Sequence, residues 1–283
     1  MNHSLLIEIQ GFLSKGEVIP YLGPAVLGLD EAPENPDTPE RLVEILTSKV
    51  TVPHKIRKNL TAAGQYIENF KHRKTLVKEL NEAFAHAPKP NSLHRWLAKG
   101  DAKIPLIVDV WYDPSLLEAF KERTDFGLIQ GVSRAEHMTD WVHYFDAALN
   151  QMDESTASAW TTLLYQPLGC VRPMSNFIIS DSDYVEVLTE IDIQTPIPER
   201  VRELRSGRHF LFLGCRFTTQ LERTYARQIM KRSSDVHWAV LPETATRNEL
   251  RFMEEQGIRR IEMPLAHFAN ALIDGGAPCG RAA

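Results

Sequence analysis

The chain has 283 residues, of which 43% are hydrophobic and 24% are charged. These values are those of an ordinary globular protein with a sizeable core, and they exclude a disordered or fibrous chain. The sequence holds no run near the roughly 20 apolar residues of a membrane span, and its first residues lack the basic and apolar regions of a signal peptide. We therefore expect a cytoplasmic protein that does not associate with membranes.

Metal and nucleic-acid binding are also disfavoured. The three cysteines, Cys170, Cys215 and Cys279, form no C-x-x-C pair, and the ten histidines show no H-x-x-x-H spacing. The net charge is −5, and the basic excess after residue 196 is small. A protein that binds duplex nucleic acid normally has a denser basic face, so we expect no metal and no nucleic acid.

The amino-terminal half begins with an amphipathic helix, followed by a short apolar strand over residues 18–22 and a turn at Gly23. Residues 30–39 read as a loop, and Thr38 caps a helix that begins with Pro39 and runs to about residue 49. Residues 53–100 show helical patterns only, with Ser92 as a cap near their end. We interpret about 53–103 as a helical layer inserted into the domain.

Strands return further along the chain. Residues 106–112 form an apolar run, Asp113 and Pro114 open a helix, and residues 126–132 read as another strand. Residues 133–160 give no firm assignment. Further strands are expected at 160–164 and 177–179, and a helix at 183–191.

The last third alternates between strand and helix. Strands are expected at 209–214, 236–241 and 258–263, with helices at 218–232, 246–256 and 265–273. Strands separated by single helices need crossover connections, which makes the sheet parallel. We predict an α/β fold, a Rossmann-like, mostly parallel sheet with helices on both faces, in a single domain spanning residues 1–283.

In such a sheet, ligands bind at the carboxyl ends of the strands. Four segments follow predicted strand ends: Gly23 to Ala25, Trp111 to Asp113, Leu168 to Cys170, and Gly214 to Phe217. A glycine there lets the backbone approach a pyrophosphate. Gly23 and Gly214 are equally well explained as residues that permit a tight turn.

The order of these segments resembles the sirtuin-like family, especially its zinc-free branch among bacterial NAD-consuming proteins. Gly23-Pro-Ala25 resembles the family's G-A-G loop, and Val108-Asp-Val-Trp-Tyr-Asp113 resembles the strand that ends T-x-N-Y-D. Gln166-Pro-Leu-Gly169 resembles K-L-H-G, and Leu211 to Phe217 resembles L-F-x-G-x-S. The resemblance implies that NAD or a related adenine nucleotide is the ligand. The residues implied to bind it are Gly23, Ala25, Trp111, Asp113, Gly214, Cys215 and Arg216.

Two departures concern catalysis. The family's asparagine, which organises the nicotinamide ribose, is replaced by Trp111, and the histidine that acts as general base is replaced by Leu168. Neither side chain can take a proton near neutral pH. The resemblance therefore implies a sirtuin-like domain that binds a nucleotide but is catalytically degenerate.

Two alternatives stay open. An active NAD glycohydrolase would use Asp113, Asp109 or His94 in place of the lost groups, although Asp113 is also explained as a helix cap. A non-catalytic scaffold for a protein partner would have Trp111 filling the old nicotinamide pocket. Deacetylation is disfavoured because three scattered cysteines cannot build a four-cysteine zinc module. Cys215 reads as a small apolar residue under a turn, or as an activated thiol beside Arg216. The oligomeric state is not predicted.

Overall fold

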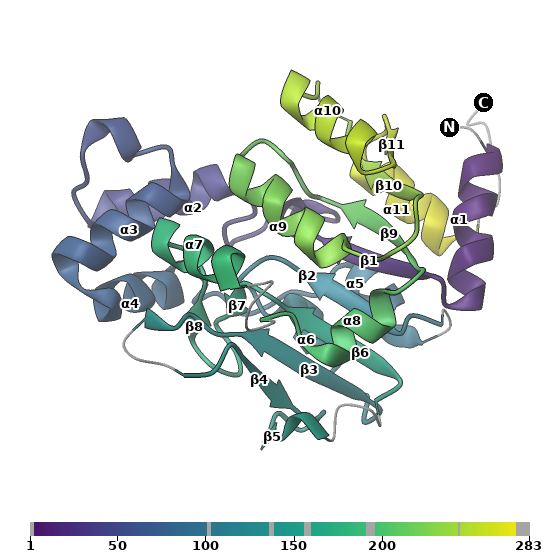
Figure 1. Ribbon diagram of the computed structural model, residues 1–283, viewed down its shortest axis with the longest axis horizontal. Coiled ribbons are helices and arrows are strands. Elements are labelled where there is room, and N and C mark those ends of the chain that lie inside the picture. The colour runs from purple at the N-terminus through teal and green to yellow at the C-terminus, as the bar shows by residue number, and fades with distance from the viewer. Residues whose placement is uncertain are drawn as a thin grey trace.

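The computed structural model describes residues 3–100, 103–135, 139–155, 160–190, 196–242 and 244–275. A sheet in the strand order β11-β10-β9-β1-β2-β6-β3-β4-β5 crosses the molecule (Figure 1). Neighbouring strands from β11 to β3 are parallel, and β4 and β5 add an antiparallel edge. The predicted α/β fold with a mostly parallel sheet is confirmed. The strands are β1 (Val18–Leu22), β2 (Leu106–Asp109), β3 (Phe126–Gly131), β4 (Val142–Phe145), β5 (Gln151–Met152), β6 (Thr162–Gln166), β9 (His209–Leu213), β10 (His237–Val240) and β11 (Ile258–Ile261).

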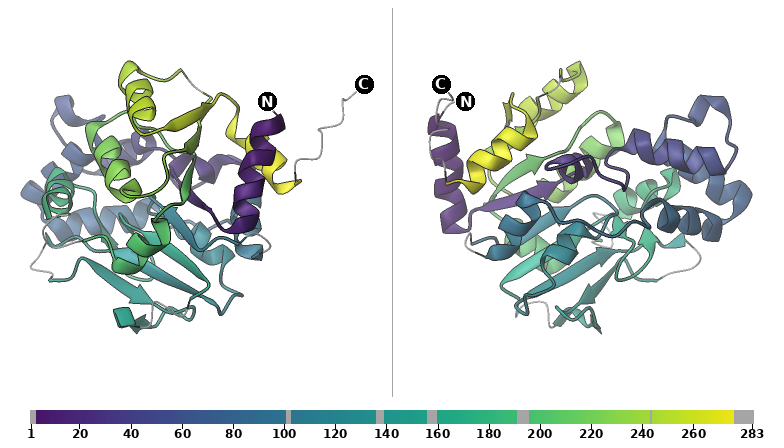
Figure 2. Two further views of the ribbon diagram at one scale, coloured as in Figure 1. Left: turned by 45° about the vertical axis from the view of Figure 1, so that its right-hand side comes forward. Right: turned by 180° about the vertical axis from the view of Figure 1, so that it is seen from behind.

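Both faces of the sheet are covered by helices, as Figure 2 shows from two sides. Alternate residues of each strand enter opposite cores: in β1, Ile19 and Tyr21 face one core and Val18 and Leu22 the other. The first core takes α2 (Pro39–Lys49), α3 (Leu60–Lys71), α4 (Arg73–Ala83), α7 (Asp181–Glu190), α8 (Glu199–Arg205), α9 (Gln220–Met230) and α10 (Arg247–Glu255). The second takes α1 (His3–Lys15), α5 (Ser92–Lys99), α6 (Ser115–Ala119) and α11 (Leu265–Ile273).

Helices α2, α3 and α4 pack on one another at one side of the molecule, on the left of Figure 1, and α7 packs on α3. A small second sheet of β7 (Gly169–Cys170) and β8 (Asn176–Phe177) lies nearby. Arg73, at the start of α4, is 2.8 Å from Asp183 and 2.9 Å from Glu68, and it also donates to the Phe177 carbonyl. This buried ion pair joins α4 to α7 and to β8. Two 3₁₀ turns, η1 (Pro24–Gly28) and η2 (His54–Ile56), complete the fold.

Some boundaries differ from those that the sequence predicts. The strand expected at 106–112 ends at Asp109, because Trp111 and Tyr112 turn away into the first core. The cap of α5 is Asn91 instead of Ser92. The unassigned stretch contains β4 and β5, whose antiparallel pairing depends on β3 and could not be read locally. The inserted helical layer at 53–103 and the single domain 1–283 stay predictions.

Candidate functional site

The candidate residues gather at the carboxyl edge of the sheet. Strands β9, β1, β2 and β6 are neighbours, and Leu22 is paired with Leu213 on one side and with Asp109 on the other. The segments after these strands therefore meet at one edge, as the sequence predicts. The turns that follow β1 and β9 pack closely against each other.

The two strand-end glycines pack against each other. A Cβ on Gly23 would lie 2.5 Å from the Gly214 carbonyl oxygen and 2.7 Å from the Cys215 Sγ. Gly214 has φ +68°, and a Cβ there would lie 2.6 Å from the Val26 nitrogen. The Ala25 N–H donates to the Gly214 carbonyl at 3.2 Å. The contact between the turns after β1 and β9 accounts for both glycines.

Cys215 is a buried thiol. It is 7% exposed and lies 3.5 Å from the Tyr21 carbonyl oxygen. Burial raises the pKa of Cys215 well above its ordinary value, and the carboxylates of Glu222 and Asp109 raise it further. A thiol in this environment stays protonated and packs as a small apolar residue.

Arg216 is engaged by a carboxylate of the same fold. Its Nε and Nη2 each lie 2.8 Å from Glu249, which also accepts from the Phe217 and Thr246 N–H groups. Burial opposes ionisation of Glu249, but Arg216 and these backbone donors outweigh it and lower the pKa to about 2. Arg216 thus holds the start of α10 to the end of β9.

Trp111 lies with its indole in the first core, 4% exposed. The indole Nε1 donates to the Pro36 carbonyl at 2.8 Å, and the ring packs on Phe84 and Tyr112. Leu168 is also buried, and its carbonyl accepts from the Ile178 N–H. Apolar side chains thus stand at both positions where the resemblance places catalytic groups.

The loop over residues 30–38 is fixed to the body of the protein. Arg41 donates to the carbonyls of Pro33, Glu34 and Asn35 at 2.8–3.1 Å. The bond from Trp111 adds a further tie. Sequence reasoning missed Arg41, because an arginine in the first turn of a helix gives no sign that it binds the preceding loop.

Asp109 and Asp113 are buried carboxyl groups, 5% and 4% exposed. Burial and the neighbouring Asp113 raise the pKa of Asp109 well above its ordinary value, against hydrogen bonds from the Gln166 side chain and the Trp111 backbone. Burial also raises the pKa of Asp113, which accepts from the Ser115 N–H at 2.8 Å. The N-cap of α6 is Pro114, so Asp113 precedes the cap residue, although its carboxyl group binds the first N–H of the helix. The raised pKa values of Asp109 and Asp113 favour a protonated carboxyl group in the pair.

His94 belongs to the start of α5. It forms a capping box with Asn91, and its Nδ1 accepts from the Asn91 N–H at 3.3 Å. Burial lowers the pKa of His94 to about 4, so the ring is neutral near pH 7. Its hydrogen bond to the backbone explains its position without a ligand.

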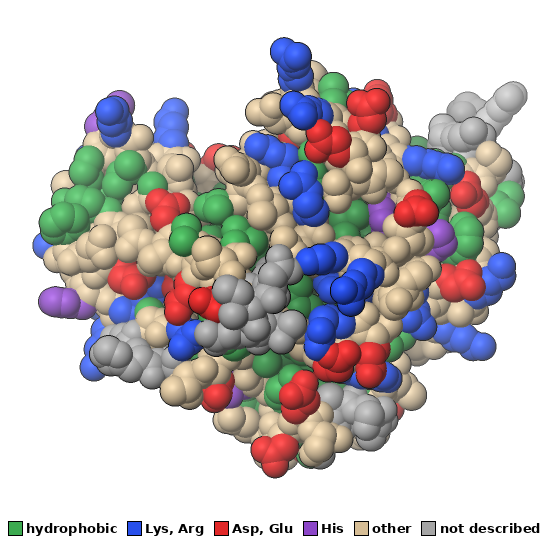
Figure 3. Space-filling view, in the orientation of Figure 1, with side chains coloured by type: hydrophobic (Ala, Val, Ile, Leu, Met, Phe, Trp, Pro, Cys, Tyr) green, Lys and Arg blue, Asp and Glu red, His purple; other side chains and the backbone are tan. Residues whose placement is uncertain are grey.

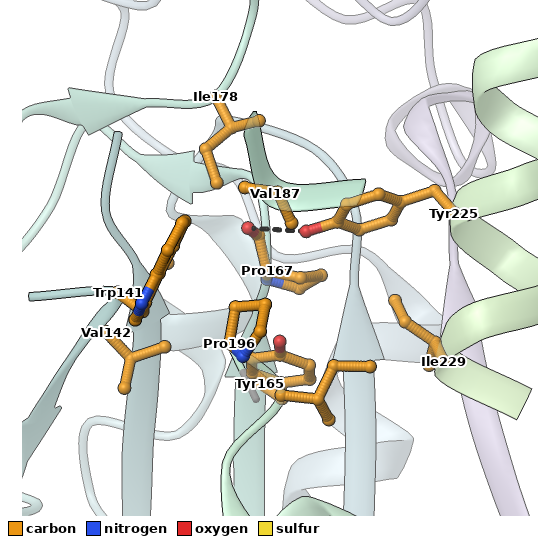
Figure 4. A pocket seen from close by; sticks show the side chains of 11 residues that line it. Trp141, Val142, Tyr165, Pro167, Ile178, Val187, Pro196, Tyr225 and Ile229 are labelled. Atoms are coloured by element: carbon orange, nitrogen blue, oxygen red, sulfur yellow. Dashed lines mark hydrogen bonds between the residues drawn. The ribbon is translucent and has the colours of Figure 1, made fainter. Parts of the chain in front are cut away.

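A closed slot lies on the first-core side of β6 and β3 (Figure 4). Its walls are mostly apolar, and the Tyr225 hydroxyl donates across it to the Pro167 carbonyl at 3.1 Å. Its volume is about 10 Å³, room for one water molecule and not for a nucleotide.

Basic side chains show on the face drawn in Figure 3, interspersed with acidic ones. Arg200 and Arg202 of α8 are ion-paired with Glu203 and Glu199, and Arg227 with Glu255. These basic side chains are therefore engaged by acidic neighbours on the same surface. Within the described ranges, no group of three or more metal-ligating side chains and no helix able to span a membrane is present.

Comparison with known proteins gives a match to a family model and alignments with solved structures. A solved structure published as a structural basis for the mechanism and regulation of Sir2 enzymes aligns with a TM-score of 0.42 and 11% identity, covering 96% of this chain and 97% of that one. No curated protein matches. The family model of the SIR2-like domain matches residues 105–261. This match runs from β2 to β11 and takes in Trp111, Leu168 and Gly214, but not the Gly23 loop. Since it spans more than half of the sequence, the chain belongs to the SIR2-like domain family.

Proposed function

We propose that this chain is a SIR2-like domain that does not cleave NAD and that serves as a non-catalytic scaffold. The observation that carries the proposal is the burial of Trp111 and Leu168, the two residues that the sequence resemblance aligns with the family's catalytic asparagine and histidine. An indole that is hydrogen-bonded to Pro36 and packed on Phe84 cannot position a ribose or a water molecule.

The energetics of the reaction support this proposal. Breaking the nicotinamide bond of NAD passes through a transition state with oxocarbenium character, which depends on positioned polar groups. Loss of the positioning group and the base together removes several powers of ten in rate. The candidate replacements do not compensate: the raised pKa of Asp109 and of Asp113 opposes the carboxylate form that a base needs, and His94 is committed to its cap.

A second candidate is binding of NAD or a related adenine nucleotide without cleavage. The observation that favours it is family membership together with glycines at the ends of the adjacent strands β1 and β9.

The deciding experiment incubates the purified chain with NAD overnight and measures released nicotinamide, alongside calorimetric titration with NAD and ADP-ribose. We expect release equal to that of a buffer blank and no heat of binding. Release above the blank, lost in Asp113→Asn, would overturn the proposal in favour of a glycohydrolase. Binding without release would establish the second candidate.

Two Trp111 variants test whether the Trp111 ring prevents a nucleotide from binding at the carboxyl edge of the sheet. Trp111→Ala removes the indole, and ADP-ribose binding should then become measurable if the variant keeps its circular dichroism spectrum. Trp111→Phe keeps a ring in the aromatic cluster and loses only the bond to Pro36, so it should stay folded and bind no nucleotide. Nucleotide binding by Trp111→Phe would show that the hydrogen bond to the loop, and not the aromatic ring, prevents binding.

A further inference from the structure

A groove of about 680 Å³ lies away from the strand-end crevice, between α4 and the β7–β8 hairpin. One wall is a face of α4, and the other comes from the hairpin and from the segment after β3. The α4 wall comprises Arg73, Lys74, Val77, Lys78, Asn81, Glu82 and Ala85, and the opposite wall Ser133, Ala135, Met174, Ser175 and Asn176. The volume is in the range of sites that bind small molecules or peptide segments.

The groove is braced by one hydrogen bond between its walls and by another within the wall opposite α4. The Ser175 hydroxyl donates to the Asn81 side chain at 2.9 Å, and the Ser133 N–H donates to the Asn176 side chain at 2.8 Å. Below the groove, Arg73 is ion-paired with Asp183. A preformed groove spares a ligand the cost of ordering its walls.

The charge of the groove comes from α4 alone. Lys74 is exposed and forms no ion pair with any described residue. Lys78 lies 3.5 Å from Glu82, which also contacts Lys49, and the Lys78 side chain is 69% exposed, so its ammonium group stays accessible to a ligand. Among the described residues, the opposite wall carries no charged side chain. The groove is therefore complementary to an anionic partner.

The spacing of the two lysines selects the form of that partner. Lys74 and Lys78 are one helical turn apart, a rise of about 6 Å along α4. In an extended peptide, side chains two residues apart point the same way and are separated by about 6.6 Å. The whole α4 wall is about 16 Å long, the length of roughly five extended residues.

We infer that this groove binds an extended acidic peptide segment of a partner protein, with carboxylates at alternate positions facing Lys74 and Lys78. Val77 and Met174 offer apolar surface for a side chain next to the acidic pair. The inference deepens the proposed scaffold function, on which it rests, by naming the class of partner and the surface that takes it.

The test is fluorescence anisotropy with a labelled hexapeptide, Gly-Asp-Ser-Asp-Leu-Gly, titrated with the full chain. We expect saturable binding that weakens with added salt, and little binding of the same peptide with asparagine in place of both aspartates. Lys74→Gln and Lys78→Gln should each weaken binding about two- to fivefold, the contribution of one exposed ion pair. Lys58→Gln, an exposed lysine outside the groove, is the matched control and should change nothing.

A blocking variant keeps the test independent of charge. Val77→Trp should fill the groove and abolish binding while the circular dichroism spectrum stays unchanged. The inference is overturned by equal binding of the aspartate and asparagine peptides, by equal effects of the Lys74 and Lys58 variants, or by no binding. It is also overturned if a short single-stranded oligonucleotide competes equally well, since any polyanion would then suffice. Because nicotinamide release is measured separately, failure here leaves the absence of NAD cleavage standing.

Discussion

At the scale of single residues, the charged groups near the strand ends are bound to partners within the fold. Arg216 faces Glu249, whose residue is fully buried and which accepts from four donors. A buried carboxylate with this many donors stabilises the folded state only while it is ionised. The arrangement explains Arg216 as a structural residue and gives it a testable pH dependence.

Replacement of Glu249 by glutamine should lower the free energy of unfolding by about 2 kcal/mol at pH 7, because hydrogen bonds to a charged group are lost. The folded pKa of about 2 lies below the ordinary glutamate value. The stabilisation is therefore complete above the ordinary value and is lost as the pH falls towards 2. Urea unfolding at several pH values should show the difference between the two proteins narrowing below about pH 5.

Arg216→Gln is the companion variant and should lose the same pH-dependent part. A difference between wild type and Glu249→Gln that stays constant from neutral to acid pH would contradict this account. So would a change in NAD binding on replacement of Arg216.

At the scale of elements, the turns that follow β1 and β9 lie in close contact at the carboxyl edge of the sheet. The turn at Gly214 is left-handed, and its backbone touches Val26 of η1. Gly207 has the same φ of +68°, but a Cβ added there would have no other atom within 4 Å. The two glycines thus share one conformation and differ only in the space around them.

Gly207→Ala should cost about 1 kcal/mol of unfolding free energy, the penalty of a left-handed residue with a Cβ. Gly214→Ala should cost that amount and about 2 kcal/mol more, because the Cβ would lie 2.6 Å from the Val26 nitrogen. Thermal unfolding of both variants gives the comparison. Equal losses would mean that the contact between the two turns relaxes easily.

At the scale of the whole molecule, one buried ion pair links parts that are far apart in the sequence. Arg73 is the first residue of α4 and lines the groove, and Asp183 lies in the first turn of α7. Burial opposes ionisation of Asp183, but Arg73, the Ile179 N–H and the Ser133 hydroxyl outweigh it and lower its pKa. The α2–α4 helices are thereby tied to the sheet and to the β8 segment.

Arg73→Met should lower the free energy of unfolding by about 3–5 kcal/mol, because it leaves the Asp183 carboxylate buried without its cation. Lys71→Met, an exposed lysine two residues away, is the control and should change it by less than about 0.5 kcal/mol. The double variant with Asp183→Asn should lose less than the sum of the single changes. Additive losses in urea unfolding would show that the pair does not act as a unit.

The alternation of strand and helix after residue 200 was readable from the sequence, and so was the convergence of Gly23, Trp111 and Gly214 at one edge of the sheet. Periodicity and caps are local signals, and parallel strands bring their carboxyl ends together whatever the side chains. The antiparallel strands β4 and β5 were not readable, because their pairing depends on β3 and on no turn signal.

The sequence by itself thus determined the fold class and the family resemblance, since these follow from patterning and from residue identity. Only the tertiary structure decided that the Trp111 indole packs on Phe84 and donates to Pro36, that Arg216 faces Glu249, and that Lys74 and Lys78 line a groove with the β7–β8 hairpin. Those outcomes depend on contacts between segments up to about a hundred residues apart. A linear pattern contains no information on which side chains meet across such a distance.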